Sequence, residues 1–268
     1  MELLWTSKPP NPVLTWANIA MVARTTHVYT ESMFATDRDR QIVQTVARFG
    51  QLTSGQISEL LFHDGSSPTR PSRALNRLLQ SRHLARIERR LIGGTGAGSG
   101  HYVYQLGTQG RKYLGREAGY PYRAVHYHTL AIADAFIGLK RLEREGTIEI
   151  IGMATEPDTW QTIAGADLRP DLFVELGIPS KGITLSLWIE MDMGTERQKQ
   201  LKEKLARYWH AYQHATESDL KVFPVVLFLA PDDERVKELS YLVNSGPDEA
   251  KALFMVQHQG SFPQLLLS

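Results

Sequence analysis

The hydrophobic pattern of the first half of the chain predicts three helices in succession. Apolar residues recur at helical spacing in three segments, residues 37–49, 54–62 and 70–84. Thr36 or Asp37 is expected to cap the first helix, and Thr53 or Ser54 the second, because their side-chain oxygens can accept the free backbone N–H groups. The inward face of the third helix carries leucines, Leu75, Leu78, Leu79 and Leu84.

A β-hairpin is expected to follow these helices. Two short alternating segments, residues 85–92 and 101–106, flank the glycine-rich stretch 93–100. Thr108 is then expected to cap a short helix. Three helices and a hairpin are the order of a winged helix-turn-helix, which we expect over residues 36–118. In that fold the third helix presents side chains to the major groove of DNA.

The second half of the chain mixes helical and strand patterns. Helices are expected at residues 126–145, 194–213 and 232–243. Strands are expected at residues 148–154, 171–176, 183–192, 222–230 and 252–257, with the fully apolar segment 222–230 central in the sheet. This order predicts an α/β sheet domain over residues 122–268 whose first three strands form a meander. The chain is therefore expected to be of the α+β class, with residues 1–35 as an N-terminal arm.

Composition narrows the possible chemistry. The chain has no cysteine, which excludes disulfides, thiolate metal sites and cysteine nucleophiles. The N-terminus lacks the pattern of a signal peptide, and no apolar run approaches the ~20 residues of a membrane span. We therefore expect a cytoplasmic protein with no membrane partner.

Positive charge is concentrated in one part of the chain. The net charge is +1, yet residues 66–112 carry eight arginines and one lysine against a single acid, Glu88. Such a block is typical of a nucleic-acid surface. The residues expected to contact double-stranded DNA lie on the third helix and the hairpin: Arg70, Ser72, Arg73, Asn76, Arg77, Arg82, Arg86, Arg89 and Arg90. Arginine suits guanine edges and phosphates, and asparagine suits adenine.

Three acids stand at the ends of two predicted strands in the second half. Asp171 begins one strand, and Glu190 and Asp192 end the next on one face, since strand side chains alternate. Acids this close repel one another unless a cation offsets their charge, and oxygen ligands favour Mg²⁺ or Mn²⁺. Lys204, on the following helix, can lean back toward the acids. Thr195 is expected at the start of that helix, where free N–H groups hold anions.

These acids resemble the PD-(D/E)XK plan of restriction-endonuclease-like domains. The resemblance rests on Arg-Pro-Asp at residues 169–171 and on Glu-x-Asp at residues 190–192. It implies that Asp171 and Glu190 bind metal, with Asp192 in the place where the common motif has lysine. Either Lys204 has taken over the catalytic role of that lysine, or the site no longer cuts DNA.

The chain also resembles the replication-relaxation family of plasmid-associated proteins over about residues 37–230. The resemblance rests on four phrases, DRQIVQTVARFGQLTSGQISELLF, HTLAIADAFIGL, RPDLFVEL and IEMDMGTERQKQLKEKLARY. It implies a role in replication, relaxation or mobilisation of plasmids or other mobile elements, with replication or conjugation machinery as partners. Binding as a homodimer on paired half-sites is compatible with the sequence.

Two functions remain open at this point. In the first, the winged helix binds duplex DNA and the nuclease-like domain is a scaffold for partners, which the unusual Asp192 favours. In the second, the protein is a Mg²⁺-dependent DNA endonuclease or nickase with Asp171, Glu190, Asp192 and Lys204 as its catalytic residues, which the acidic face beside a cationic helix favours.

Overall fold

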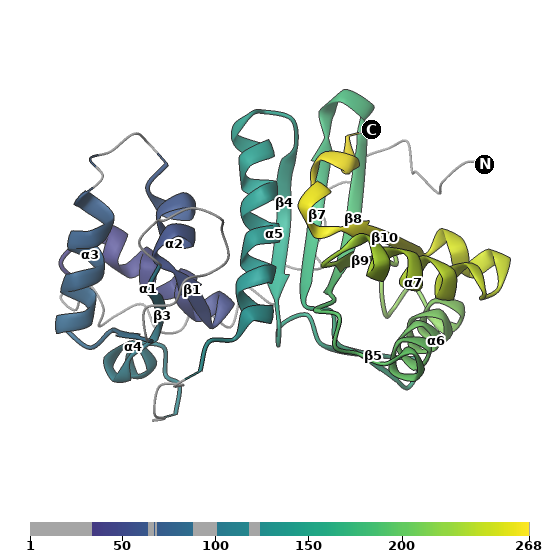
Figure 1. The fold of residues 1–268 in the computed structure, drawn as a ribbon, viewed down its shortest axis with the longest axis horizontal. Coiled ribbons are helices and arrows are strands. Elements are labelled where there is room, and N and C mark those ends of the chain that lie inside the picture. Colours follow the sequence, from purple (N-terminus) through teal and green to yellow (C-terminus); the bar gives the residue numbers. More distant parts are fainter. Residues whose placement is uncertain (1–33, 64–66, 68, 88–100, 118–123, 268) are drawn as a thin grey trace. The chain divides into compact units, whose positions relative to one another are not determined.

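A computed structural model describes residues 34–63, 67, 69–87, 101–117 and 124–267 of the protein. The fold is a mixture of helices and β-sheets (Figure 1). The chain divides into two compact units, and the boundary between them falls at Ile137 and Gly138.

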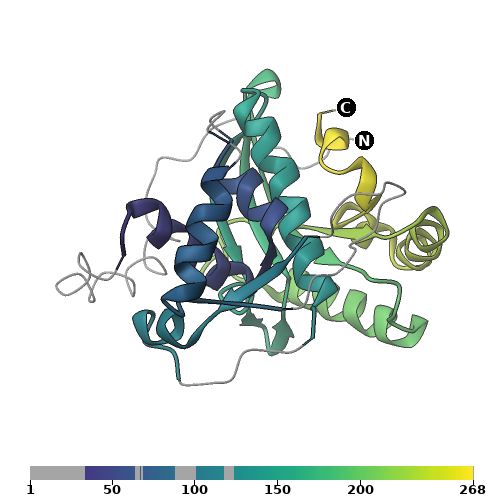
Figure 2. The same cartoon turned by 60° about the vertical axis from the view of Figure 1, so that its left-hand side comes forward.

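The first unit contains short helices and a small sheet (Figures 1 and 2). Its elements are α1 (Asp37–Phe49), β1 (Gln51–Thr53), α2 (Ser54–Leu61), α3 (Thr69–Gln80), β2 (Leu84–Arg86), β3 (Val103–Leu106) and α4 (Thr108–Tyr113). The strands form an antiparallel sheet in the order β1-β3-β2. The three predicted helices are thus confirmed, and β2 pairs with β3 as the hairpin prediction expected, while residues 88–100, with the expected tip, lie outside the described residues. Strand β1 was not predicted, because three residues are too few to show a period.

Two of the expected helix caps are present. The side chain of Thr36 accepts a hydrogen bond from the backbone N–H of Asp39 at 3.1 Å. Thr53 forms a reciprocal capping box with Gln56. The prediction for Thr108 was wrong: it is the first residue of α4, and the N-cap is Gly107, which has no side chain to accept a hydrogen bond.

The third helix is shorter than its pattern indicated. It ends at Gln80, and Leu84 begins β2 instead of extending the helix. Arg82 lies between them with a φ of 56°, a left-handed conformation that no helix continues through. Leu75, Leu78 and Leu84 are buried as expected. The spacing of these leucines fits one continuous helix, so the sequence did not reveal that the helix ends before Leu84.

The first half of helix α5 (Tyr127–Arg144) packs with α1 and α2, although its pattern placed it with the sheet domain. Gln56 of α2 donates hydrogen bonds to the carbonyl of Leu130 at 2.8 Å and to Asp134 Oδ1 at 2.7 Å. The rings of Phe49 and Phe136 lie 5.7 Å apart. These contacts explain why the compact unit extends through Ile137.

The second unit is built on a five-stranded sheet in the order β10-β9-β8-β7-β4. Its strands and helices are β4 (Glu149–Thr155), β5 (Gln161–Ile163), β6 (Ala166–Leu168), β7 (Leu172–Ile178), β8 (Ile183–Met191), α6 (Gln198–His214), β9 (Val225–Ala230), α7 (Asp233–Asn244) and β10 (Phe254–His258). Strands β4, β7 and β8 pair antiparallel, and β8, β9 and β10 pair parallel. The predicted meander is therefore confirmed, and β9 lies inside the sheet as expected.

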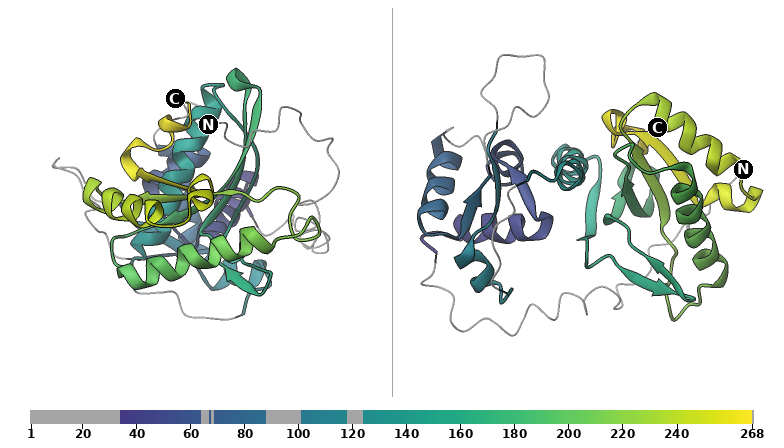
Figure 3. Two further views of the ribbon diagram at one scale, coloured as in Figure 1. Left: turned by 90° about the vertical axis from the view of Figure 1, so that its right-hand side faces the viewer. Right: turned by 60° about the horizontal axis from the view of Figure 1, so that its bottom comes forward.

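Helices α6 and α7 lie on the same face of this sheet (Figure 3). Each follows a strand and returns to a parallel neighbour, and right-handed crossovers of this kind place both helices on one side. From Gly138 onward α5 packs beside the C-terminal segment: a Cβ at that glycine would meet Pro263 Cδ at 2.8 Å. No helix within the described ranges is both long and apolar enough to cross a membrane.

Helix α6 begins later than predicted. It begins at Gln198 instead of Gly194, because Gly194 has a φ of 73° and its N–H is bound by the side chain of Asp192 at 2.6 Å. Thr195 thus precedes the helix and does not stand at its N-terminus. Its buried face ends with Ala211, and Tyr212 is exposed. The hairpin of β5 and β6 was not predicted.

Candidate functional site

The exposed side of α3 is polar and basic. Arg70, Ser72, Arg73 and Asn76 are exposed on this helix, while its opposite face buries Ala74, Leu75 and Leu78 in the core. The two faces follow from the 3.6-residue period of the helix. This side of α3 therefore offers arginine and asparagine donors suited to phosphates and base edges.

Arg77, expected among the DNA-contacting residues, is bound within the unit. Its Nε and Nη2 atoms donate to the two oxygens of Asp39 at 2.9 and 2.7 Å. Asp39 lies on α1 and is only 1% exposed. The hydrogen bond to Asp39 raises the pKa of Arg77. This guanidinium therefore joins α3 to α1, and its donors toward Asp39 are not available to DNA.

The remaining arginines of the basic block lie after α3. Arg82 is exposed in the turn, and Arg86 is exposed on β2 with its guanidinium carbon 4.0 Å from the ring centre of Tyr102. Arg89 and Arg90 fall outside the described residues. Whether any of these side chains contacts DNA stays a prediction.

The sheet of the second unit brings Asp171 and Glu190 together. Leu172 of β7 pairs with Ile189 of β8, so the antiparallel register places the preceding Asp171 opposite Glu190. Both are buried, at 8% and 4% exposure. Asp171 Oδ2 accepts the backbone N–H of Met191 at 2.7 Å, which holds the two strand ends together.

Glu190 is held by two donors from α6. Lys204 Nζ donates to Glu190 Oε2 at 3.0 Å, and the Tyr208 hydroxyl donates to Glu190 Oε1. Burial raises the pKa of Glu190 to about 7, the charge of Lys204 opposes the shift, and the nearby Asp171 adds to it. Glu190 therefore changes its protonation state near neutral pH.

Lys204 also bonds Glu196, with Nζ 2.9 Å from Oε1. Burial lowers the pKa of Lys204, but the charge of Glu190 and the bond to Glu196 outweigh it, so the pKa lies above its ordinary value. Lys204 therefore stays a cation and cannot act as a base near neutral pH. Burial and the charge of Glu190 raise the pKa of Tyr208, so its hydroxyl remains a hydrogen-bond donor.

Asp192 has different partners from the other two acids. Arg235 of α7 donates to it through Nε at 2.7 Å and Nη2 at 3.3 Å. Gly194 N–H binds the same carboxylate, as described above. The geometry thus gives Asp192 a role in joining β8 to α7, and its expected role as a metal ligand receives no support from these contacts.

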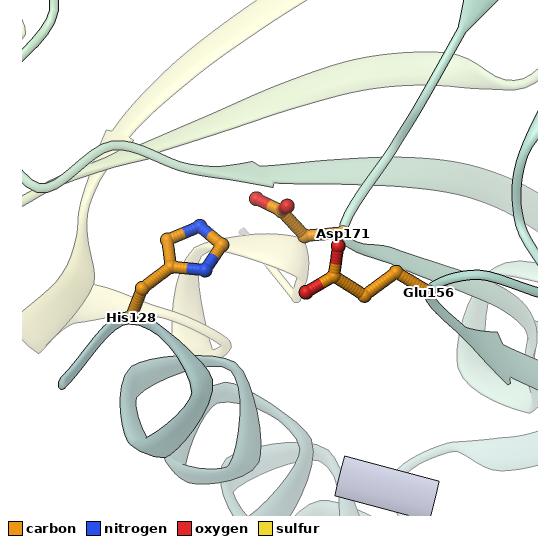
Figure 4. Close-up of side chains that lie close together, drawn as sticks. All are labelled: His128, Glu156 and Asp171. Carbon is orange, nitrogen blue, oxygen red and sulfur yellow. The ribbon is translucent and has the colours of Figure 1, made fainter. Parts of the chain in front are cut away.

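A further carboxylate, which the sequence pattern did not reveal, lies beside Asp171. One oxygen of Glu156 and one of Asp171 lie within 4.8 Å of each other, a spacing that a metal ion can bridge (Figure 4). The backbone N–H of Glu156 also binds the carbonyl of Asp171 at 3.2 Å. His128, drawn in the same view, lies on the part of α5 that belongs to the first unit.

The second unit therefore brings two carboxylates close together, and a divalent cation between them stays a prediction. Asp171 and Glu156 supply carboxylates, the ligand type that Mg²⁺ and Mn²⁺ prefer. The oxygens of Glu190 are bound by Lys204 and Tyr208, and its role as a metal ligand stays a prediction. The sequence pattern led to Asp171, Glu190 and Lys204, but it did not reveal Glu156, Tyr208 or Arg235. Tyr208 lies on the buried face of α6, and helical spacing gives no sign of its hydrogen bond.

Comparison with known proteins identifies a family. The family model described as Replication-relaxation matches residues 43–226. The matched range covers α2, α3 and the strands and helix that carry Asp171, Glu190 and Lys204. No curated protein and no solved structure matches the chain.

Proposed function

Since the chain belongs to the replication-relaxation family, we propose that it is a DNA-binding protein that acts in replication, relaxation or mobilisation of a plasmid or other mobile element. Residues 36–118 act as a winged helix-turn-helix that holds duplex DNA. The observation that carries the proposal is the exposed basic side of α3, formed by Arg70, Ser72, Arg73 and Asn76. The order of three helices and paired hairpin strands supports it.

The test measures duplex binding by the full-length protein over a range of salt concentrations. Replacing Arg70 and Arg73 with alanine removes cations from α3 without exposing the core, because both side chains are exposed. Each lost phosphate contact lowers the slope of log K against log salt by about 0.9. Arg207→Ala, at an exposed arginine of α6, is the matched control. Unchanged affinity and slope in the α3 variant would contradict the proposal.

A second function, metal-dependent cleavage of DNA, is favoured by one observation, the ion pair of Lys204 with Glu190. The order α5-β4-β7-β8-α6-β9 supports a restriction-endonuclease-like domain, with Asp171 just before β7 and Glu190 near the end of β8. Lys204 then supplies from α6 the cation that the common motif places where Asp192 stands. This arrangement favours cleavage over a domain that serves only as a scaffold.

Each residue has a distinct task in this second function. Asp171 and Glu190, with Glu156 beside Asp171, would hold the cation. With Mg²⁺ or Mn²⁺ bound, the site would supply a water molecule of lowered pKa and positive charge near the phosphate. Tyr208 orients one oxygen of Glu190, and the protonated Lys204 stabilises negative charge that develops on the phosphate.

The test is incubation of supercoiled plasmid with the full-length protein, with and without Mn²⁺. Nicking or linearisation is expected with the wild type and is lost in Glu190→Ala and Lys204→Met. Glu203→Ala changes an exposed acid on the same helix and keeps the activity. An intact plasmid together with retained duplex binding would rule out cleavage and leave the second unit as a scaffold for replication or conjugation partners.

A further inference from the structure

We propose that Trp160 and Arg169 form a platform that binds an unpaired base of single-stranded DNA beside Asp171 and Glu190. The inference rests on the proposed cleavage function, and it names single-stranded DNA as the substrate class of that site. The binding itself is independent of cleavage and is measured without a metal.

The first observation is an exposed aromatic ring paired with a cation. Trp160 is 46% exposed, which leaves a large apolar surface in water. The guanidinium carbon of Arg169 lies 4.9 Å from the centre of its ring, and Arg169 is itself exposed. Proteins that bind single strands stack bases on aromatic rings and use arginines to hold the backbone. Because Arg169 lies over one face of the indole, the base stacks on the opposite face.

The second observation is that both residues are tied to the segment that carries Asp171. The hydroxyl of Thr159, a residue only 2% exposed, donates to the carbonyl of Pro170. The N–H of Trp160 binds the carbonyl of Pro157 at 3.0 Å, which closes the turn. Arg169 precedes Asp171 by two residues, a span of about 7 Å in extended chain. The platform and Asp171 therefore belong to one short, tied segment of the chain.

The platform stands at the base of the hairpin formed by β5 and β6, which packs firmly on its own unit. Ile163 and Leu168 are 2% and 1% exposed. At the hairpin tip the carbonyl of Ala164 lies 3.2 Å from His210 Nε2 of α6. Because both ends of the hairpin are anchored, little ordering is needed when a strand binds, which favours affinity.

The geometry favours an unpaired base over a duplex. Inside a duplex both faces of every base are covered by stacking, so an indole can stack only with a base that is single-stranded or flipped out. The proposed recognition of duplex DNA by α3 and of single strands by Trp160 and Arg169 therefore uses different surfaces. A protein acting in relaxation or at replication origins meets both forms of DNA.

The experiment measures fluorescence anisotropy of a labelled oligothymidylate with the full-length protein in EDTA. Trp160→Ala is expected to weaken binding about tenfold or more, within the range for loss of one stacked base. Trp160→Phe keeps most of the affinity because it keeps a ring. Arg169→Ala weakens binding and lowers the salt slope by about 0.7. Tyr241→Ala, at an aromatic residue that is 69% exposed on α7, is the matched control.

The inference would be overturned if wild type, Trp160→Ala and Tyr241→Ala bound the oligonucleotide with equal affinity. It would also be overturned if Trp160→Ala and Tyr241→Ala lost affinity to the same extent. A duplex probe in the same samples separates the proposals: Trp160→Ala leaves duplex binding unchanged, and Arg73→Ala reduces it. Failure of the cleavage proposal appears only as an intact plasmid. Quenching of tryptophan fluorescence by the oligonucleotide, reduced in Trp160→Phe, confirms the contact in a variant that keeps an aromatic ring.

Discussion

Replacing Glu190 with glutamine should stabilise the protein, and the gain should depend on pH. The wild-type carboxylate is buried, and burial raises its pKa from 4.5 to about 7 despite the ion pair with Lys204. Glutamine has nearly the same shape and still offers an oxygen to Tyr208, but it never carries the charge. Lys204 keeps Glu196 as its anionic partner in the variant.

The magnitude follows from the pKa shift. Between pH 4.5 and about 7 the folded protein keeps a proton on Glu190 that the unfolded chain has released. The unfolded state then binds fewer protons, so the free energy of unfolding falls as the pH rises through this window. The raised pKa corresponds to about 3 kcal/mol once both states are ionised. The advantage of Glu190→Gln should therefore be near zero at pH 4.5 and approach that value at pH 8.

The assay is urea unfolding of the full-length protein at pH 5 and pH 8, followed by circular dichroism and tryptophan fluorescence. Glu203→Gln is the control, since Glu203 lies on the same helix and its side chain is 56% exposed. Its free energy of unfolding should match that of the wild type at both pH values. If Glu190→Gln gains equally at both pH values, or loses stability at pH 8, burial is not what raises the pKa of this carboxylate.

Three further predictions concern hydrogen-bonded side chains. Arg77→Ala should lower the free energy of unfolding by about 2 kcal/mol in urea titrations, because it leaves the buried Asp39 without its ion-pair partner. The loss is moderate because the arginine side chain is 42% exposed and water screens the pair. Arg73→Ala should have little effect on the same transition. Arg235→Ala should cost about 3–5 kcal/mol in the same assay, since both members of that ion pair are buried, and a cost below that of Arg77→Ala would contradict this reasoning. Tyr208→Phe removes a hydrogen bond that lowers the pKa of Glu190, so the pH window of the unfolding free energy should move to higher pH, and an unchanged window would show that the hydroxyl does not bind the carboxylate.

Much of the element order was predictable because helix and strand periods are local. The spacing of leucines located α3, and alternation located β8 with Glu190 near its end. The predictions that were wrong or missing concern segments in which the spacing of apolar residues does not distinguish a helix from a strand. A three-residue strand such as β1 is shorter than any pattern, and Leu84 suits a helix as well as a strand.

The residues of the candidate site were also predictable only where they depend on local sequence. Proline before Asp171 and alternation in β8 were enough to single out Asp171 and Glu190, because strand ends are local features. The partners of Arg77 and Asp192 were not foreseeable, since Asp39 and Arg235 are 38 and 43 residues away. The sequence pattern placed Arg77 on a DNA-binding surface and Asp192 at a metal site.

Most of the element order, the basic block and two of the acids can be derived from the sequence alone, since these depend on neighbours within a few residues. Which charges are used internally depends on the tertiary packing. Pairing of β7 with β8 brings Asp171 to Glu190, and packing of α6 and α7 on one face brings Lys204 and Tyr208 to Glu190 and Arg235 to Asp192. A buried charge needs a partner because water is excluded, and which partner it finds depends on strand register and helix packing over the whole unit.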